Sequence, residues 1–211
     1  MRRMMTLILA ASAASVAVFA QTQAPARPAS PAGSAAIQVG WKATDAAGAR
    51  ATNGKWIEVT YGRPIKRGRA DLFGSGADYG KTLNAGAPVW RAGANVSTRL
   101  KTEVPLVFGT TAVPAGEYSL FVDLKGPASW TMILSSHQVQ ATYDPNDKVK
   151  LWGSYGYTPD KDVARVPMKV EALPYSVDEL TYVFTDVTGT SGTLRLMWDT
   201  VMASVPFKVG Q

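Results

Sequence analysis

Hydrophobic and polar residues alternate along most of the chain beyond position 35. Ile57, Val59 and Tyr61, for example, alternate with Glu58 and Thr60, and this period of two residues is typical of strands with one buried face. The same pattern runs through 37–41, 118–124, 194–198 and 201–209. Apolar and β-branched segments predict further strands at 97–102, 105–109, 129–135, 163–172 and 180–187.

Turn-forming residues separate these strands, and helical periodicity is almost absent. Gly, Pro and Asn cluster at 114–116, 125–127, 145–146 and 189–192. About ten short strands with such turns predict an all-β fold, a single antiparallel β-sandwich. A jelly roll is one topology that fits this pattern. Pro167 lies inside a predicted strand and lacks an N–H donor, so we expect that strand to lie at a sheet edge or to carry a bulge.

The first 20 residues have the form of a signal peptide. Arg2 and Arg3 supply positive charge, an apolar Ala-rich run follows at 7–19, and Ala20 precedes the predicted cleavage before Gln21. The apolar run at 7–19 is shorter than the roughly 20 residues that a membrane-spanning helix needs. We therefore expect a periplasmic or secreted protein with no stable membrane span after cleavage.

Residues 21–35 are rich in Ala, Pro, Gln and Ser, a composition that predicts a disordered tether. The sandwich domain is then predicted at 36–211, a usual length for one domain. The chain has no Cys, so disulfides cannot stabilise it even in an oxidising compartment. A domain of this length is expected to be stable on its hydrophobic core alone.

Charge and titratable residues argue against several functions. Removing Arg2 and Arg3 with the leader lowers the formal net charge from +6 to +4, and no basic helix or stripe is visible, so no nucleic-acid partner is expected. His137 is the only histidine and Cys is absent, so the sequence predicts no metal site and no cofactor. No G-x-S-x-G motif accompanies His137, which we interpret as an exposed loop histidine rather than part of a catalytic triad.

A long Gly- and Arg-rich segment, 61–95, interrupts the strand pattern. Long loops are uncommon in compact domains and are often functional. Its arginines could converge on an anion beside aromatic walls, because guanidinium groups bind carboxylates and phosphates. In the alternative interpretation they donate to loop carbonyls, and a Trp plugs one end of the sandwich. The candidate ligand-binding residues are Arg63, Arg69, Tyr79, Trp90, Arg91 and Asn95.

Several short clusters follow one another in a fixed order. They are Tyr61-Gly62-Arg63-Pro64, then Phe73-Gly74, Val89-Trp90-Arg91-Ala92-Gly93-Ala94-Asn95, Pro114-Ala115-Gly116-Glu117-Tyr118-Ser119-Leu120-Phe121, Trp130, Trp152-Gly153 and Asp162-Val163-Ala164-Arg165-Val166. This order resembles a bacterial family, domain of unknown function 2911, over about 37–187. The resemblance implies an exported, β-rich protein, and it implies no established activity.

These observations favour a non-enzymatic envelope module that binds a small polar or anionic ligand, such as a glycan fragment, or a partner protein. One alternative is a hydrolase that acts on glycans with two carboxylates; another is an envelope protein with a purely structural role. Spacing singles out no pair among Glu58, Glu103, Glu117, Asp123, Asp162, Glu171 and Glu179. The segment 144–147, Asp-Pro-Asn-Asp, lacks the pattern of a calcium loop, and we interpret it as an ordinary turn.

Overall fold

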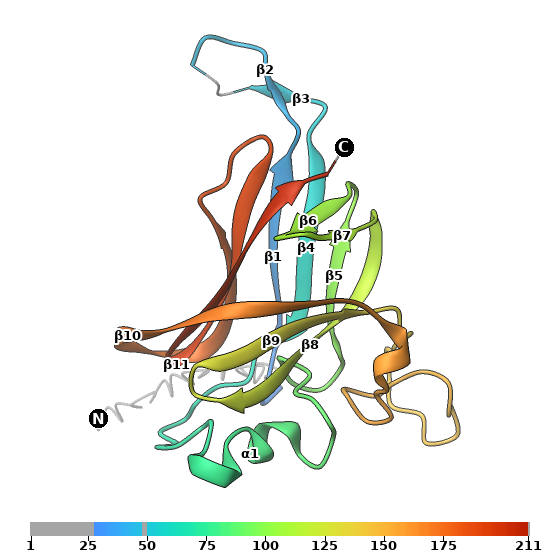
Figure 1. The fold of residues 1–211 in the computed structure, drawn as a ribbon, viewed down its shortest axis with the longest axis vertical. Helices are drawn as coiled ribbons and strands as arrows, with labels where there is room; N and C mark the ends of the chain where they lie inside the picture. Colours follow the sequence, from blue (N-terminus) through green and yellow to red (C-terminus); the bar gives the residue numbers. More distant parts are fainter. Residues whose placement is uncertain (1–27, 48–49, 211) are drawn as a thin grey trace, which may run out of the picture.

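The computed structural model describes residues 28–47 and 50–210, which form a nine-stranded antiparallel sheet folded into two layers (Figure 1). The strand order is β1-β4-β5-β8-β9-β10-β11-β6-β7, and a separate ladder pairs β2 with β3. The predicted all-β antiparallel sandwich is confirmed. The predicted leader, with its cleavage between Ala20 and Gln21, lies outside the described residues.

The elements are short except for the last two strands. The strands are β1 (Ala32–Val39), β2 (Lys42–Ala43), β3 (Ala51–Thr52), β4 (Lys55–Gly62), β5 (Thr98–Thr102), β6 (Leu106–Phe108), β7 (Thr111–Val113), β8 (Gly116–Gly126), β9 (Ser129–Ser135), β10 (Asp162–Thr185) and β11 (Ser191–Val209). The helical turns are η1 (Gly76–Asp78), α1 (Lys81–Asn84) and η2 (Pro159–Lys161). Within 28–47 and 50–210, no helix is long and apolar enough to cross a membrane.

Strand β10 links the two layers, and a pair of prolines marks the point of transfer. Its first part pairs with β9 up to Met168, and from Lys169 onward it pairs with β11. Two residues beyond the Lys169–Ser204 pair, the same register would place Pro167 opposite Pro206. Neither proline can donate a ladder hydrogen bond, so the β10–β11 ladder ends there. The strand that contains Pro167 lies inside the sheet rather than at its edge, and it carries register shifts; Pro167 itself pairs with Thr131 on β9.

Both long strands were predicted as pairs of shorter ones. The segments 163–172 and 180–187 belong to β10, and 194–198 and 201–209 belong to β11. The breaks in alternation correspond to irregularities within continuous strands: the β10 register shifts on both sides of Val177, and Asp199 in β11 has a φ of 52°. Bulges of this kind change the alternation without ending a strand.

Strand β1 begins inside the segment that was predicted as a tether. Ala32 pairs with Gly62, and Ala35 pairs with Val59, so residues 32–35 belong to the sheet rather than to the segment before it. Their small side chains carry no hydrophobic pattern, and main-chain pairing with β4 orders them instead. The residues of the tether before 28 lie outside the described part of the chain.

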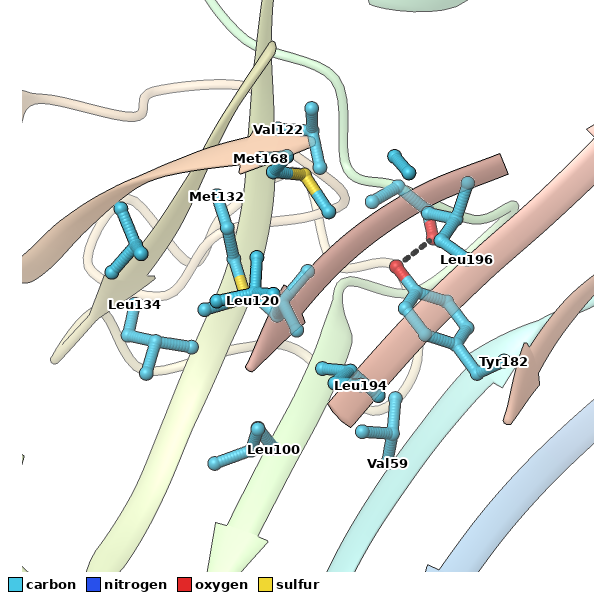
Figure 2. Close-up of a cluster of buried hydrophobic side chains, with 14 of the residues drawn as sticks. Val59, Leu100, Leu120, Val122, Met132, Leu134, Met168, Tyr182, Leu194 and Leu196 are labelled. Atoms are coloured by element: carbon cyan, nitrogen blue, oxygen red, sulfur yellow. Dashed lines mark hydrogen bonds between the residues drawn. The ribbon is translucent and has the colours of Figure 1, made fainter. Parts of the chain in front are cut away.

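The main core lies between the layers and is filled by alternating side chains from the facing strands. Val59, Leu100 and Leu120 project from β4, β5 and β8 toward Leu194 and Leu196 on β11 (Figure 2). Tyr182 is buried among them, and its hydroxyl donates to the carbonyl oxygen of Ala92 at 3.0 Å. A hydroxyl buried this deeply needs such an acceptor.

Part of the outer face of the sheet is also buried. Phe121 and Ile133 lie on β8 and β9 with no exposed surface, and Leu151 and Tyr157 from the 137–161 loop pack against them in a second cluster. This loop therefore covers one outer face of the sandwich, which explains why β8 is buried on both faces.

The Gly/Arg-rich segment 61–95 packs against the main core, with α1 below the strands in Figure 1. It buries apolar residues that include Leu72 and Phe73. The end of the segment packs against its beginning, and Gly62 permits this close approach, because a Cβ at position 62 would lie 2.0 Å from the carbonyl oxygen of Ala94. The segment is therefore a folded part of the domain.

Candidate functional site

The six candidate residues of the 61–95 segment do not converge on one pocket. Trp90 is 1% exposed, and its ring stacks on that of Trp198 at a centroid distance of 6.2 Å. The hydroxyl of Tyr79 accepts a hydrogen bond of 2.9 Å from the indole N–H of Trp130. Trp90 and Tyr79 therefore belong to the aromatic part of the main core.

The arginines bind protein groups. Arg69 donates to the carbonyl oxygens of Ile65 and Lys66, and its guanidinium lies 5.5 Å from the ring centroid of Trp198. Arg63 forms an ion pair of 2.5 Å with Glu179. These contacts match the alternative interpretation of the sequence, in which the arginines bind protein groups and hold the loop in place.

Asn95 contacts the segment that enters β1. Its side-chain amide donates to the carbonyl oxygen of Ser30 at 3.2 Å, while Arg67 donates to that of Ala29. The backbone N–H of Arg63 donates to Pro31 at 2.7 Å. Three consecutive carbonyls before β1 are therefore held by the 61–95 segment.

Arg91 points toward the 137–161 loop. It donates to the carbonyl oxygen of Asn95 at 2.7 Å, and its guanidinium lies 5.6 Å from the ring centroid of Tyr155. It also lies against Gly153, where an added Cβ would be 2.6 Å from Nη1 and where φ is +65°. The Trp90-Arg91 and Trp152-Gly153 motifs are thus in contact, and they lead to a cleft in the 137–161 loop.

This aromatic cleft consists of two adjoining hollows that share Tyr143, Trp152 and Tyr155. One hollow, of about 360 Å³, is lined by the three rings. The other, of about 420 Å³, adds charged and polar residues of the loop. Both volumes fall within the range of small-molecule sites, roughly 300–1,000 Å³. Tyr143 and Tyr155 are 59% and 45% exposed, so this hollow presents two large aromatic side chains to solvent.

A buried glutamine organises the floor of the cleft. Gln140 is 6% exposed; its amide N–H groups lie within 3.2 Å of the carbonyl oxygens of Asp144, Asp147 and Lys150. Its side-chain oxygen accepts a hydrogen bond from the N–H of Asp144. One side chain therefore fixes the whole 144–150 turn, so the cleft has a defined shape without a ligand.

The charged residues of the cleft carry both signs. Lys148, Lys150 and Lys161 line it, together with Asp144 and Asp147. Backbone N–H groups of Lys150 and Val149 hold the pKa of Asp147 below its ordinary value. One oxygen of Asp144 likewise accepts the N–H of Asn146. These bonds are ordinary turn chemistry, as the sequence indicated.

His137 lines the same cleft, and it is half-buried rather than exposed as predicted. The N–H of Thr158 donates to its Nε2 at 3.2 Å, and its ring lies 5.8 Å from that of Tyr157. Packing of the 137–161 loop over the sheet accounts for this burial. His137 thus connects the cleft to the cluster beneath the loop.

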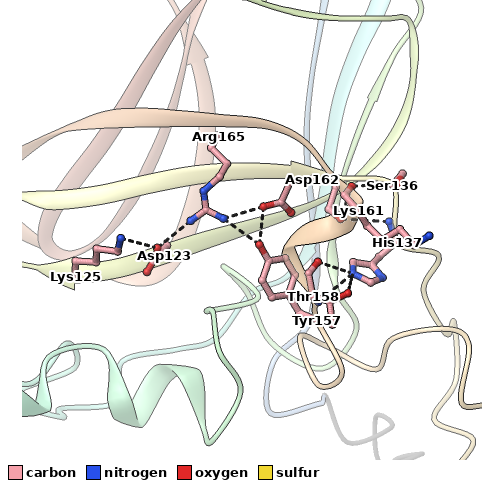
Figure 3. A network of polar contacts seen from close by, with 10 residues as sticks. Asp123, Lys125, Ser136, His137, Tyr157, Thr158, Lys161, Asp162 and Arg165 are labelled. Carbon is pink, nitrogen blue, oxygen red and sulfur yellow. Dashed lines mark hydrogen bonds and ion pairs between the residues drawn. The ribbon is translucent and has the colours of Figure 1, made fainter.

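Beside the cleft, a polar network fastens the loop to the sheet (Figure 3). Arg165 bridges two carboxylates, with bonds of 3.0 Å to Asp123 and 2.8 Å to Asp162. The hydroxyl of Tyr157 donates to the same Asp162 oxygen at 2.7 Å. Burial, and then the hydrogen bond to Asp162, raise the pKa of Tyr157 above its ordinary value. Among the described residues, no group of three or more His, Asp or Glu side chains could hold a metal ion.

Only indirect signals in the sequence pointed to this cleft. Three aromatic residues occur within 143–155, and Trp152-Gly153 is one of the clusters that carried the family resemblance. No hydrophobic period links them, because the segment is an irregular loop. The parallel bridge between Val139 and Leu151 brings its two ends together.

The chain also matches a known family. The family model described as "Protein of unknown function (DUF2911)" matches residues 43–207, and it confirms the resemblance found in the sequence. No curated protein and no solved structure matches the chain. The matched region includes both the 61–95 segment and the 137–161 loop, so the aromatic cleft lies within the family domain.

Proposed function

The chain belongs to the DUF2911 family, and we propose that it is a non-enzymatic module of the bacterial envelope that binds a small polar or anionic ligand in the aromatic cleft. The observation that carries this proposal is the exposure of Tyr143 and Tyr155 beside lysines in a hollow of small-molecule size. Such sites combine aromatic walls with a few polar groups that orient the ligand. The predicted signal peptide supports the location in the envelope.

The bonding of the carboxylates supports binding over hydrolysis. Glycoside hydrolysis with two carboxylates needs one as an acid and the other as a base or nucleophile. Asp123 and Asp162 both bind the guanidinium of Arg165, and Asp162 also accepts the bond from Tyr157. Within the cleft, Asp144 and Asp147 each accept backbone N–H groups of their own turn. The hydrogen bonds and ion pairs of Asp123 and Asp162, and of Asp144 and Asp147, therefore suit structural roles rather than acid–base catalysis.

A thermal-shift screen of the full-length chain against sugars, carboxylates and phosphates tests the proposal. Tyr143→Ala removes an exposed ring of the cleft, and Tyr175→Ala is its control, because Tyr175 is also 59% exposed but does not line the cleft. A ligand at about 100 times its Kd adds about 2.7 kcal/mol to stability. We expect hits that stabilise the parent and the Tyr175→Ala variant but not Tyr143→Ala. A screen without hits, or hits that Tyr143→Ala retains, would refute the proposal.

A further inference from the structure

We infer that the ligand of the aromatic cleft is an anionic sugar: a pyranose ring that carries one carboxylate or phosphate and several free hydroxyls. This inference rests on the proposed binding function and specifies its ligand. It follows from three kinds of side chain that share one cleft: aromatic rings, ammonium groups and carboxylates.

The aromatic hollow suits the apolar face of a ring. Tyr143 and Trp152 lie at a centroid distance of 5.6 Å with 57° between their planes, so they form two walls rather than one flat stack. The Arg91 guanidinium covers one face of Tyr155, and the hydroxyl of Tyr155 donates to the carbonyl oxygen of Ala85 at 2.9 Å. Tyr155 is therefore fixed in place while 45% of it stays exposed. A fixed, exposed ring costs little entropy when a ligand stacks on it.

The lysines of the other hollow suit a single anionic group. Lys148 donates to the carbonyl oxygen of Pro145, and Lys161 lies 3.9 Å from Asp160 at the limit of an ion pair. For Lys150, the described part of the chain provides no hydrogen bond or ion pair to its ammonium group. Lys150 and Lys161 each lie near a loop carboxylate, Asp147 and Asp160, but neither ammonium group is held in a close ion pair. An ammonium group is a point charge that donates to carboxylate and phosphate oxygens alike.

The carboxylates distinguish a sugar from other anions. Asp144 and Asp147 use Oδ1 for backbone N–H groups, and no group of the described chain donates to either Oδ2. Free carboxylate oxygens accept hydroxyl donors, which a sugar has and a simple aromatic acid lacks. They also repel a ligand with several negative charges, such as a nucleoside triphosphate. A sugar ring with one negative charge and several hydroxyls can contact the aromatic rings, the ammonium groups and the carboxylates of the cleft together.

Isothermal titration calorimetry with the full-length chain tests this assignment with five probes: glucuronate, glucose 6-phosphate, glucose, benzoate and ATP. We expect glucuronate or glucose 6-phosphate to bind about tenfold or more tightly than glucose, as one charge-assisted contact implies. The stronger of the two identifies the anionic group. The double variant Lys150→Gln/Lys161→Gln should remove the preference over glucose. The control Lys42→Gln/Lys55→Gln, on β2 and β4 outside the cleft, should retain it.

The other outcomes separate the ligand class from the binding function. Equal binding of glucose, or tighter binding of benzoate or ATP, would overturn the anionic sugar and leave a binding module with another ligand. A preference that persists in Lys150→Gln/Lys161→Gln would also overturn it, because the charge would then be recognised elsewhere. If none of the five probes binds, the inference is overturned. The binding function itself fails only if the wider thermal-shift screen also has no hit.

Discussion

The guanidinium of Arg91 lies over the ring of Tyr155, with 5.6 Å between its central carbon and the ring centroid. This contact joins two loops that are more than 60 positions apart in the chain. The hydroxyl of Ser97 reinforces it by donating to the carbonyl oxygen of Gly153 at 2.5 Å. The segment that the sequence marked as the candidate site therefore supports a neighbouring cleft.

Replacing Arg91 with Ala should destabilise the protein and weaken binding in the cleft. The variant loses the bond to the Asn95 carbonyl and the stacking on Tyr155. A hydrogen bond from a charged group is worth about 1.5–3 kcal/mol and an exposed cation–π contact about 0.5–1 kcal/mol, so we expect a loss of about 2–4 kcal/mol in the free energy of unfolding. Urea denaturation measures it. Arg91→Lys should be intermediate, because it keeps the charge without the planar group.

Arg50→Ala is the control for this series, since Arg50 is exposed and its side chain makes no hydrogen bond, ion pair or ring contact within the described residues. Its unfolding should match that of the parent. If Arg91→Ala also unfolded like the parent, the two loops would have to be held together without Arg91.

Gln140→Ala should loosen the 144–150 turn while leaving the sheet intact. The change leaves three carbonyl oxygens without the amide that binds them and opens a cavity beneath the cleft. We expect a loss of about 2–4 kcal/mol in local stability, the sum of a small cavity and unpaired polar groups. Hydrogen exchange should show faster exchange at Val149 and Lys150 than in Gln138→Ala, whose exposed glutamine serves as the control. Unchanged exchange in this turn would contradict the role given to Gln140.

The fold was predictable where side-chain alternation reports burial directly. The strand predicted at 129–135 coincides with β9, because one face of it contacts the core throughout. The boundaries failed where main-chain geometry decides them. Small residues of 32–35 are ordered by pairing with β4, and bulges near Val177 keep β10 continuous although its pattern breaks.

The candidate site was harder to predict, because it depends on contacts between distant residues. Arg and Trp in a Gly-rich loop have the same composition whether they bind a ligand or the protein itself. Only the partners distinguish the two, such as Glu179 for Arg63 and Trp198 for Trp90. The cleft requires Gln140 to order a turn and Tyr143 to face Trp152, neither of which follows from spacing along an irregular loop.

Shortening the chain tests the contacts before β1. A chain that begins at residue 28 keeps the carbonyls of Ser30 and Pro31 and the whole of β1, whereas one that begins at residue 36 loses these carbonyls and the first half of β1. At about 0.5–1.5 kcal/mol per hydrogen bond, we expect the shorter chain to be less stable by several kcal/mol. Thermal unfolding followed by circular dichroism compares the two. Equal melting temperatures would show that residues 28–35 contribute nothing to the sandwich.

Stability should fall at alkaline pH because of buried tyrosines. Burial raises the pKa of Tyr182 well above its ordinary value, and the neighbouring Tyr61 adds to the shift. A residue whose pKa is higher in the folded state stays protonated there while the unfolded chain ionises. Its stabilising contribution is therefore complete below the unfolded pKa of about 10 and is lost as the pH rises above it.

For Tyr182 the slope is about half of 1.4 kcal/mol of unfolding free energy per pH unit near pH 10 and approaches about 1.4 kcal/mol above about pH 11, and Tyr157 adds to it in the same direction. Denaturation at several pH values between about 9 and 11 measures this slope. Tyr182→Phe should start from a lower stability, because it loses the bond to the Ala92 carbonyl, but should decline less steeply. Tyr175→Phe, at an exposed position, should keep the slope of the parent. An unchanged slope in Tyr182→Phe would mean that Tyr182 ionises as readily in the folded protein as in the unfolded chain, and that its burial is only transient.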